Sequence, residues 1–346
     1  MTFDYYNKVT KDLLQNVPVS AQSGFSNIWA NVGTIRNRGV ELTINSYQLN
    51  TKNFTWSSNF NISHNKTILI DLGNFDPFAA TNIANLGGNL VGGASHVLVP
   101  GREIGLFYGF KVDGLYQLSD FEANGTTVKN GVPVVSQTIG TPDTRVGRLK
   151  FANTDGSENN LIDDKDRTIL GDAAPKFTFG FTNNFKYKRF NLSILLQGSY
   201  GNTIQNQVSA YVSSGNLASI GTAFNQTEKW YMNQWTVDNQ HNDVRYPAVQ
   251  TAANIVTTAA TSVVMEDGSY VRMKNLTLQY SLNVGKLKYL RAVNMFLTGT
   301  DLLTLTNYSG FDPEVSSYGS DIRLQGIDYG SYPRARNYTV GVTVAF

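Results

Sequence analysis

The last ten residues of the chain, 337–346, alternate between apolar and small polar side chains. The apolar set is Tyr338, Val340, Val342, Val344 and Phe346, and the residues between them are Asn337, Thr339, Gly341, Thr343 and Ala345. Because successive side chains of a strand point to opposite faces, the segment predicts a strand with one apolar face and one small polar face. Its length suits a tilted strand that crosses a bilayer, although a strand of a soluble sandwich would alternate in the same way.

The same two-residue period recurs along the chain. In residues 176–187, for example, Phe177, Phe179 and Phe181 alternate with Thr178 and Gly180. The recurring pattern predicts about eight strands that cross the bilayer. These crossings are expected near Phe3, Val40, Phe60, Phe181, Ile194, Leu278, Val293 and Val342. One position, Phe296, interrupts an otherwise polar face.

The polar faces of these segments carry Asn, Thr, Ser, Gln and Gly, and charged residues make up only 16% of the chain. A sheet face in open water usually carries more charge, whereas small uncharged groups are typical of the interior of a membrane barrel. Aromatic residues gather near the ends of the apolar faces, as with Phe54 and Trp56. Aromatic girdles of this kind mark both membrane interfaces.

Short and long connections alternate between the predicted strands. Short turns are expected near residues 47–53, 188–189 and 285–289, and long loops at 71–105, 119–175, 201–269 and 304–332. Residues 105–117 are expected to extend a strand or hairpin above the membrane. This arrangement predicts an all-β, transmembrane antiparallel β-barrel with long extracellular loops.

Composition excludes several classes of function. The chain has no Cys and a formal net charge of +2, so it predicts no thiol chemistry and no nucleic-acid partner. The histidines His64, His96 and His241 have no metal-site or catalytic spacing, and nothing in the sequence indicates an enzyme. The first residues do not form a signal peptide, so an outer-membrane location would make this sequence part of a longer protein.

Four stretches are more specific than barrel chemistry requires. They are NVGTIRNRGVELTIN at 31–45, DDKDRTILGDAAPKFTFGFTNNFKYKRFNLSILLQGSYGN at 163–202, EDGSYVRMKNLTLQYSL at 266–282, and NYSGFDPEV with GIDYGSYPRARNYTVGVTVAF at the C-terminal end. With these strings the whole chain closely resembles the C-terminal part of SusC/RagA-type TonB-linked outer-membrane transporters of Bacteroidetes.

The resemblance implies that residues 1–346 are part of a 22-stranded barrel of the bacterial outer membrane. It also implies uptake of glycans or oligopeptides, a SusD-like surface lipoprotein as partner, and coupling to the TonB system. The closing strand, Tyr338 to Phe346, would be recognised by the barrel-assembly machinery. The N-terminal plug and the earlier strands of the family are absent from this sequence, so we expect that it does not transport by itself.

Residues 153–166, NTDGSENNLIDDKD, predict a weak calcium loop. Calcium loops place oxygen ligands at alternate positions, with Gly at the bend and an acidic residue at the end. Here Asn153, Asp155, Asp163 and Asp166 are the candidate ligands. Family members resemble the pattern more closely, because this chain has an amide at the first position and two extra residues. A solvated acidic loop remains the alternative.

Residues 227–235, TEKWYMNQW, predict a short helix in the longest loop, with Trp230 and Trp235 exposed near Tyr231. Aromatic faces stack on sugar rings, so these three residues are candidate ligand contacts. Such residues also commonly anchor the fold of their own loop.

Two other interpretations of the chain remain open at this stage. The first is a soluble or surface-attached β-rich carbohydrate-binding module. The second is a small self-contained barrel, in which the strand near Phe3 would pair with the final strand.

Overall fold

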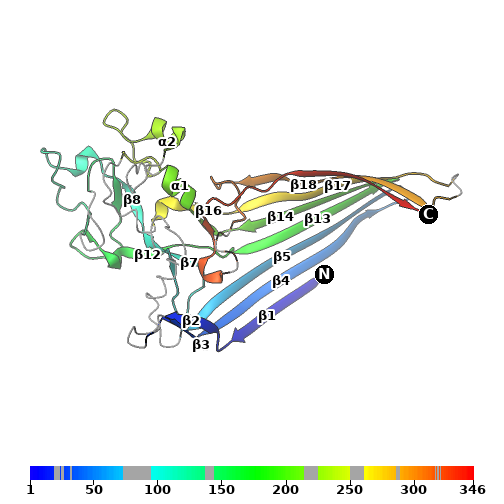
Figure 1. Ribbon diagram of the computed structural model, residues 1–346, viewed down its shortest axis with the longest axis horizontal. Helices are drawn as coiled ribbons and strands as arrows, with labels where there is room; N and C mark the ends of the chain where they lie inside the picture. The colour runs from blue at the N-terminus through cyan, green and yellow to red at the C-terminus, as the bar shows by residue number, and fades with distance from the viewer. Residues whose placement is uncertain are drawn as a thin grey trace.

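The computed structural model consists of a long curved sheet with a loop region at one of its ends (Figure 1). It describes residues 1–18, 24, 27–31, 33–72, 95–136, 144–213, 225–249, 261–285, 289–315, 317, 319 and 321–346. We call the eight-stranded sheet the wall. The loop region is the described part of residues 95–175, 201–269 and 307–336.

The wall confirms the eight predicted crossings. Its strands are antiparallel and follow the order β1-β4-β5-β13-β14-β17-β18-β20. Their bounds are Thr2–Thr10 (β1), Thr34–Asn50 (β4), Phe54–Asp71 (β5), Phe177–Tyr187 (β13), Phe190–Tyr200 (β14), Tyr270–Ser281 (β17), Ala292–Thr306 (β18) and Asn337–Ala345 (β20). The longest of them, β4 with 17 residues and β5 with 18, extend well beyond what a bilayer crossing needs.

The short connections of the wall lie at the end opposite the loop region. Tyr187 pairs with Phe190, so only Lys188 and Arg189 join β13 to β14. Ala292 pairs with Ala345, which places the C-terminus at this short-turn end (Figure 1). Short turns at one end and long loops at the other are the arrangement that the sequence predicts.

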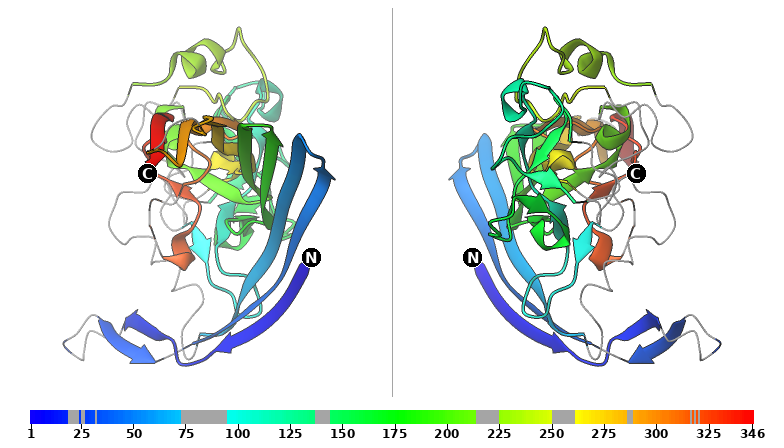
Figure 2. Two further views of the ribbon diagram at one scale, coloured as in Figure 1. Left: turned by 90° about the vertical axis from the view of Figure 1, so that its right-hand side faces the viewer. Right: turned by 90° about the vertical axis from the view of Figure 1, so that its left-hand side faces the viewer.

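The wall is an open sheet. Viewed end-on, it curves from β1 at one border to β20 at the other (Figure 2). In the described residues β1 pairs only with β4, and β20 pairs only with β18. The interpretation as a small self-contained barrel, which requires β1 to pair with β20, is therefore wrong for this structure.

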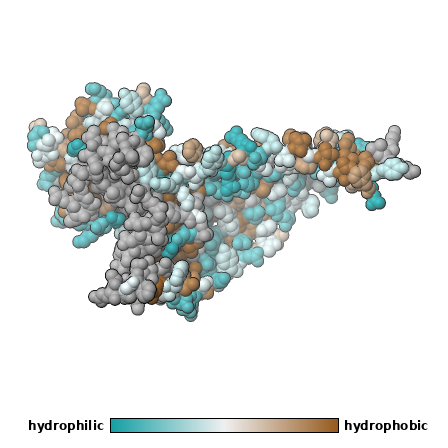
Figure 3. Space-filling view, viewed as in Figure 1, coloured by the Kyte–Doolittle hydropathy of each residue, from teal (hydrophilic) through white to brown (hydrophobic). Residues whose placement is uncertain are grey.

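The outer face of the wall carries aromatic pairs near both ends. At the short-turn end Trp56 stacks on Phe185 with ring centroids 5.7 Å apart. At the loop end Phe177 stacks on Tyr200 with centroids 5.0 Å apart. Between these pairs the face is mostly apolar; the exception Asn183 accepts a hydrogen bond from Trp56 at 3.1 Å. Apolar residues also cover much of the visible end of β18 and β20 (Figure 3). Aromatic girdles around an apolar band match a bilayer-spanning surface.

The packing of Phe296 explains why this aromatic residue stands on a polar face. Phe296 of β18 pairs directly with Gly341 of β20, and a Cβ atom at Gly341 would collide with the Phe296 ring. The ring therefore lies over the glycine and covers backbone that has no side chain of its own. An aromatic residue across from a strand glycine stabilises a pair that the glycine would otherwise weaken.

The long stretches between the wall strands fold into small sheets with their own cores, which the sequence patterns did not indicate. One core packs Phe110, Val135, Phe151 and Ile162, and another centres on Phe107 and Ile327. Residues 105–117 form β7 and β8 inside this region. The small strands are β2 (Leu14–Pro18), β3 (Asn27–Asn31), β6 (His96–Val97), β7 (Leu106–Phe110), β8 (Val112–Leu115), β9 (Val134–Val135), β10 (Leu149–Phe151), β11 (Leu161–Ile162), β12 (Arg167–Asp172), β15 (Thr203–Asn206), β16 (Met265–Asp267) and β19 (Ile327–Asp328).

Helices are few and short. The two α-helices are α1 (Gln207–Val212) and α2 (Glu228–Asn233), and 3-10 turns occur at Leu118–Asp120, Asp164–Asp166, Ser262–Val264 and Ile322–Leu324. Within the described ranges, none of the helices has the length and apolarity needed to cross a membrane.

Candidate functional site

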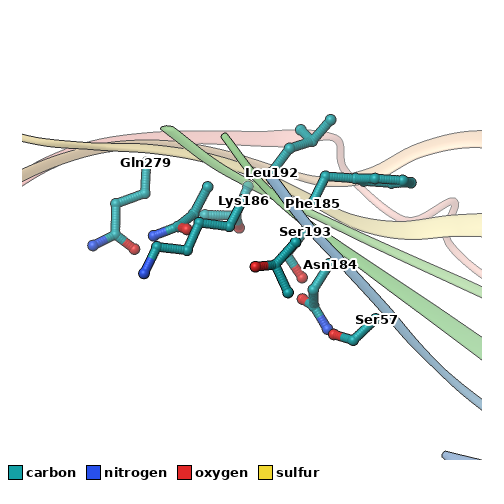
Figure 4. Close-up of a pocket in the computed structure, with 10 residues that line it drawn as sticks. Ser57, Asn184, Phe185, Lys186, Leu192, Ser193 and Gln279 are labelled. Carbon is teal, nitrogen blue, oxygen red and sulfur yellow. The ribbon is translucent and has the colours of Figure 1, made fainter. Parts of the chain in front are cut away.

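The polar face of the wall forms a groove of about 290 Å³ near the short-turn end. Figure 4 shows Leu192 on one side of the strands and Lys186, Gln279 and Asn184 on the other. Hydroxyl, amide and ammonium groups thus share one face, and the apolar side chains lie away from them. The groove is lined by Thr55, Ser57, Asn184, Phe185, Lys186, Asn191, Leu192, Ser193, Thr277 and Gln279.

A second cavity, of about 190 Å³, lies where the wall meets the loop region. The wall contributes Ser63, Asn65, Thr67 and Thr178, which are all on its polar face. The loop region contributes Ile104, Ala174, Pro175, Ile322 and Gln325. The loop region therefore packs against the polar face, which identifies that face as the interior of the wall.

The predicted calcium loop brings three of its four candidate ligands together. One carboxylate oxygen from each of Asp155, Asp163 and Asp166 lies within 4.8 Å of the others. Asp155 is exposed and Asp166 is fully buried. The Nδ2 of Asn153 donates to the backbone carbonyl of Ser157 at 2.8 Å, while its Oδ1, the atom that could bind a cation, is buried without a hydrogen-bond partner among the described residues.

Backbone amides already bind the carboxylates of this loop. Asp166 Oδ1 accepts from the amides of Thr154 (2.8 Å) and Asp155 (3.3 Å). Its Oδ2 accepts from the amide of Asp163 at 2.9 Å. The amide of Ser157 donates to Asp155 and lowers the pKa of that carboxyl. The oxygen ligands suit a hard cation such as calcium. The loop already holds its shape through its own hydrogen bonds, so a bound cation would add to the stability of the loop and would not be required for its fold.

The helix predicted around Trp230 is present, but the predicted exposure of its tryptophans is wrong. Thr227 caps α2 by accepting from the amide of Trp230 at 3.2 Å. Trp230 is 2% exposed and Trp235 is 5% exposed. A Cβ atom at Gly147 would lie 2.5 Å from the Trp235 ring, so the ring packs on that glycine. Both tryptophans are anchors of the loop region.

Tyr231 is exposed, and Met232 lies beside it in an equally exposed position. A helix turn places adjacent residues on different sides, which explains why Trp230 is buried and Tyr231 is not. Of the three candidate ligand aromatics, Tyr231 alone presents its ring to solvent in this structure.

Sequence patterns gave no sign of a charged cluster at the junction between wall and loop region. Lys66 of β5 forms an ion pair with Glu103. Burial, and then a hydrogen bond to Glu103, raise the pKa of Asp172 to about 7. The same hydrogen bond lowers the pKa of Glu103. The three residues are far apart in the sequence, so only the tertiary structure brings them together.

Asp172→Asn is expected to stabilise the loop region more at alkaline than at acid pH. The pKa of Asp172 is about 7 in the folded protein and 3.8 in the unfolded chain. The stability that the protonated carboxyl gives to the folded state is therefore fully present below pH 3.8 and is lost as the pH rises to about 7. Asparagine resembles the protonated form. Because the carboxyl is partly exposed, we expect about 1 kcal/mol, or about 2–4 °C in unfolding temperature, at pH 8.

Thermal unfolding followed from pH 4 to pH 8 checks this expectation. The difference between variant and wild type should be smallest at pH 4, grow until about pH 7 and then level off. Glu122→Gln, which changes an exposed carboxyl of the same region, is the matched control. A difference for Asp172→Asn that is equal at pH 4 and pH 8 would contradict the raised pKa.

Comparison with known proteins gives consistent matches along the chain. A family model described as "TonB dependent receptor-like, beta-barrel" matches residues 1–138. TonB-dependent receptor P3 of Formosa agariphila is 36% identical over the whole chain, which covers 32% of that protein. TonB-dependent receptor SusC of Bacteroides thetaiotaomicron is 25% identical over 99% of the chain, which covers 30% of SusC.

Solved structures show the same fold. The structure of the RagAB peptide transporter matches with a TM-score of 0.71 and 21% identity, over 99% of this chain and 33% of that chain. Its "open-open" state matches with a TM-score of 0.69. The chain thus spans about a third of the length of its relatives. Its sheet, its face chemistry and these relatives agree: the chain belongs to the SusC/RagA-type TonB-dependent receptors, which are β-barrel proteins of the outer membrane.

Proposed function

We propose that residues 1–346 form the C-terminal part of the barrel wall of a TonB-dependent importer. The observation that carries the proposal is the open sheet. Its outer face is apolar, while β1 and β20 each have one border without a partner strand in the described residues. Unpaired backbone groups are too costly in a bilayer, so further strands must continue the wall at both borders.

The cargo that we propose is a glycan or an oligopeptide, and the chain acts on it without enzymatic chemistry. The interior face supports this, because the groove and the cavity are lined mainly by hydroxyl and amide groups that can hydrogen-bond to sugars and peptides, with Lys186 as the one charged residue in the two linings. One solved relative is titled a peptide transporter, and SusC is a TonB-dependent receptor. A plug domain that contacts TonB would be supplied by a part of the protein outside this sequence.

We further propose a SusD-like lipoprotein as partner at the loop end. The exposed Tyr231 and Met232 of α2 lie at the loop end, far from the short-turn end of the wall (Figure 1). Exposed apolar side chains at this end are suited to contact either a partner protein or cargo. At the opposite end, β20 presents the aromatic terminus Phe346, and we propose that it is the strand read by the barrel-assembly machinery.

Fractionation and uptake measurements on the intact protein test the proposal. We expect the protein in the outer-membrane fraction, with migration on a gel that changes on heating. Disruption of its gene should abolish growth on one class of nutrient in a panel of defined glycans and oligopeptides, and loss of TonB should have the same effect. A protein found only in soluble fractions, with unchanged growth, would instead support a carbohydrate-binding module.

We also propose that the Asn153–Asp166 loop binds calcium as an auxiliary site. Millimolar calcium is expected to raise the unfolding temperature of the loop region, because the cation screens three clustered carboxylates. Asp155→Asn with Asp163→Asn should abolish the effect, since asparagine keeps the Oδ1 acceptor of each loop hydrogen bond and removes the charge. Calorimetry with and without calcium measures it.

Glu158→Gln is the matched control for the calcium experiment, because Glu158 is an exposed acid of the same loop outside the carboxylate cluster. It should keep the full calcium effect. Equal calcium shifts in wild type and in the double variant would show that the cation acts elsewhere, and the absence of any shift in wild type would leave a solvated acidic loop.

A further inference from the structure

A β-bulge in β17 changes which of its side chains face the interior. The register between β14 and β17 shifts between Leu195 and Leu196, so Lys274 has no counterpart on β14. Each step along a strand changes face, so one unmatched residue moves the interior face from odd-numbered positions such as Asn275 to even-numbered ones. Arg272 is thereby directed into the interior at the loop end of the wall.

Arg272 is buried, and its guanidinium faces three carboxylates: Asp312, Glu314 and, at 4.0 Å, Asp301 of β18. Only 2% of its side chain is exposed. Its Nε donates to Thr304 of the neighbouring strand β18 at 3.0 Å. Its two terminal nitrogens donate to Asp312 at 2.6 Å and to Glu314 at 3.0 Å. One arginine of the wall thus binds two carboxylates of the segment that follows β18.

The two carboxylates bind a second arginine, which lies just before β20. Arg334 Nη2 lies 3.1 Å from Glu314 Oε2, and its Nε lies 3.7 Å from Asp312 Oδ2. Arg272, Asp312, Glu314 and Arg334 form a cluster of two positive and two negative groups, which we call the charge cluster. We call the described part of residues 307–336, which join β18 to β20, the strap. The start of the strap therefore contacts Arg272 directly, and its end contacts the same two carboxylates through Arg334.

The strap is also attached to the rest of the loop region. Its strand β19 pairs with β15, and the amide of Gln205 donates to the carbonyl of Gly326 at 2.8 Å. Within the strap, Tyr308 donates to Asp328 at 2.6 Å, and Asp328 accepts from the amides of Gly330 and Ser331. Ser309 binds Glu266 of β16. These contacts order the strap, but among the described residues the charge cluster is the contact that ties its two ends to the wall.

Because the charge cluster is largely buried, each of its charged groups depends on the others being in place. A buried charge is tolerated only while its partners are in place, and removal of one partner leaves another unpaired. Asp312 is 7% exposed, so neither it nor Arg272 can be solvated where it stands. The cluster is complete only when Arg334 has arrived, and Arg334 is followed within three residues by the start of β20.

We propose that the charge cluster fastens the strap to the wall, so that ordering of the strap and pairing of the closing strand β20 with β18 are one event. When Arg334 joins the cluster, the charges of Asp312 and Glu314 are balanced. The same contact positions the chain for the start of β20, three residues later. If the strap loses its contacts with Arg272, the loop end of β20 is no longer fixed to the wall.

Hydrogen exchange measured by mass spectrometry on the intact protein in detergent tests the proposal. Arg272→Met is expected to accelerate exchange in both the strap and β20 by about tenfold or more, because two carboxylates lose their buried partner. Exchange in β13 and β14 should stay at wild-type rates. Lys186→Met is the control: it removes an interior cation of the wall that lines the groove near the short-turn end, away from the charge cluster and the strap. It should leave the strap unchanged.

Arg334→Gln acts on the same cluster from the strap side, and because 41% of Arg334 is exposed, this variant is expected to assemble even where Arg272→Met does not. It should accelerate exchange in the strap and in β20 together. Wild-type exchange in both segments would overturn the proposal. Faster exchange of the strap with β20 unchanged would also overturn it, and so would an equal effect of Lys186→Met.

Discussion

Trp230→Ala is expected to destabilise the loop region by about 3–5 kcal/mol, the usual cost of emptying a tryptophan-sized site in a core. The side chain is 2% exposed and extends from the one face of α2 that is buried. The helix cap itself is kept, because the backbone amide of residue 230 still donates to Thr227, so the loss comes from the buried ring. Chemical denaturation followed by tryptophan fluorescence and near-UV circular dichroism measures the loss.

Two other variants separate an anchor from a ligand contact. Trp230→Phe keeps most of the volume and removes an indole N–H that is buried without a partner, so it should cost far less than alanine. Tyr231→Ala, one residue away and 66% exposed, should change stability by less than about 0.5 kcal/mol. A stable Trp230→Ala protein that fails only in uptake would restore the ligand role and contradict the anchor role.

The wall could be predicted from sequence because its physics is periodic and local. A strand exposed to lipid on one side and to a polar interior on the other must alternate, and residues 176–187 or 337–346 do so without any knowledge of their neighbours. The same rule fails at a bulge. The pattern of β17 changes phase at Lys274, so reading residues 275–284 alone gives no indication that Arg272 faces the interior.

The loop region could not be predicted in this way, because its cores are assembled from residues far apart in the chain. Phe110 packs with Ile162, and Lys66 meets Glu103. Local polarity identified the stretch around Trp230 as a surface helix and was right about the helix. Burial depends on what covers the helix, and that information lies in other segments. The clustering of Asp155, Asp163 and Asp166 could be predicted, because the three residues are close in sequence.

Val340→Arg is expected to cost about 2–4 kcal/mol of wall stability, the cost of an arginine on the lipid face near the middle of the bilayer. Val340 lies on the outer face of β20, 77% exposed in this structure, and pairs with Leu297 of β18. Among the described strands, β20 lies at a border of the sheet and pairs with β18. The folded fraction in lipid vesicles, measured by heat-modifiable migration across a urea series, reports the effect.

Thr339→Arg makes the comparison decisive, because it places the same side chain one residue away on the interior face. Thr339 pairs with Thr298, a polar neighbour, so the guanidinium can remain in water and should cost less than about 1 kcal/mol. A large difference between the two variants requires lipid on the Val340 side and a polar interior on the other. Equal effects would mean that both faces meet the same medium, which is the behaviour of a soluble module and not of a membrane wall. The alternation in the last ten residues would then have its origin in a sandwich core.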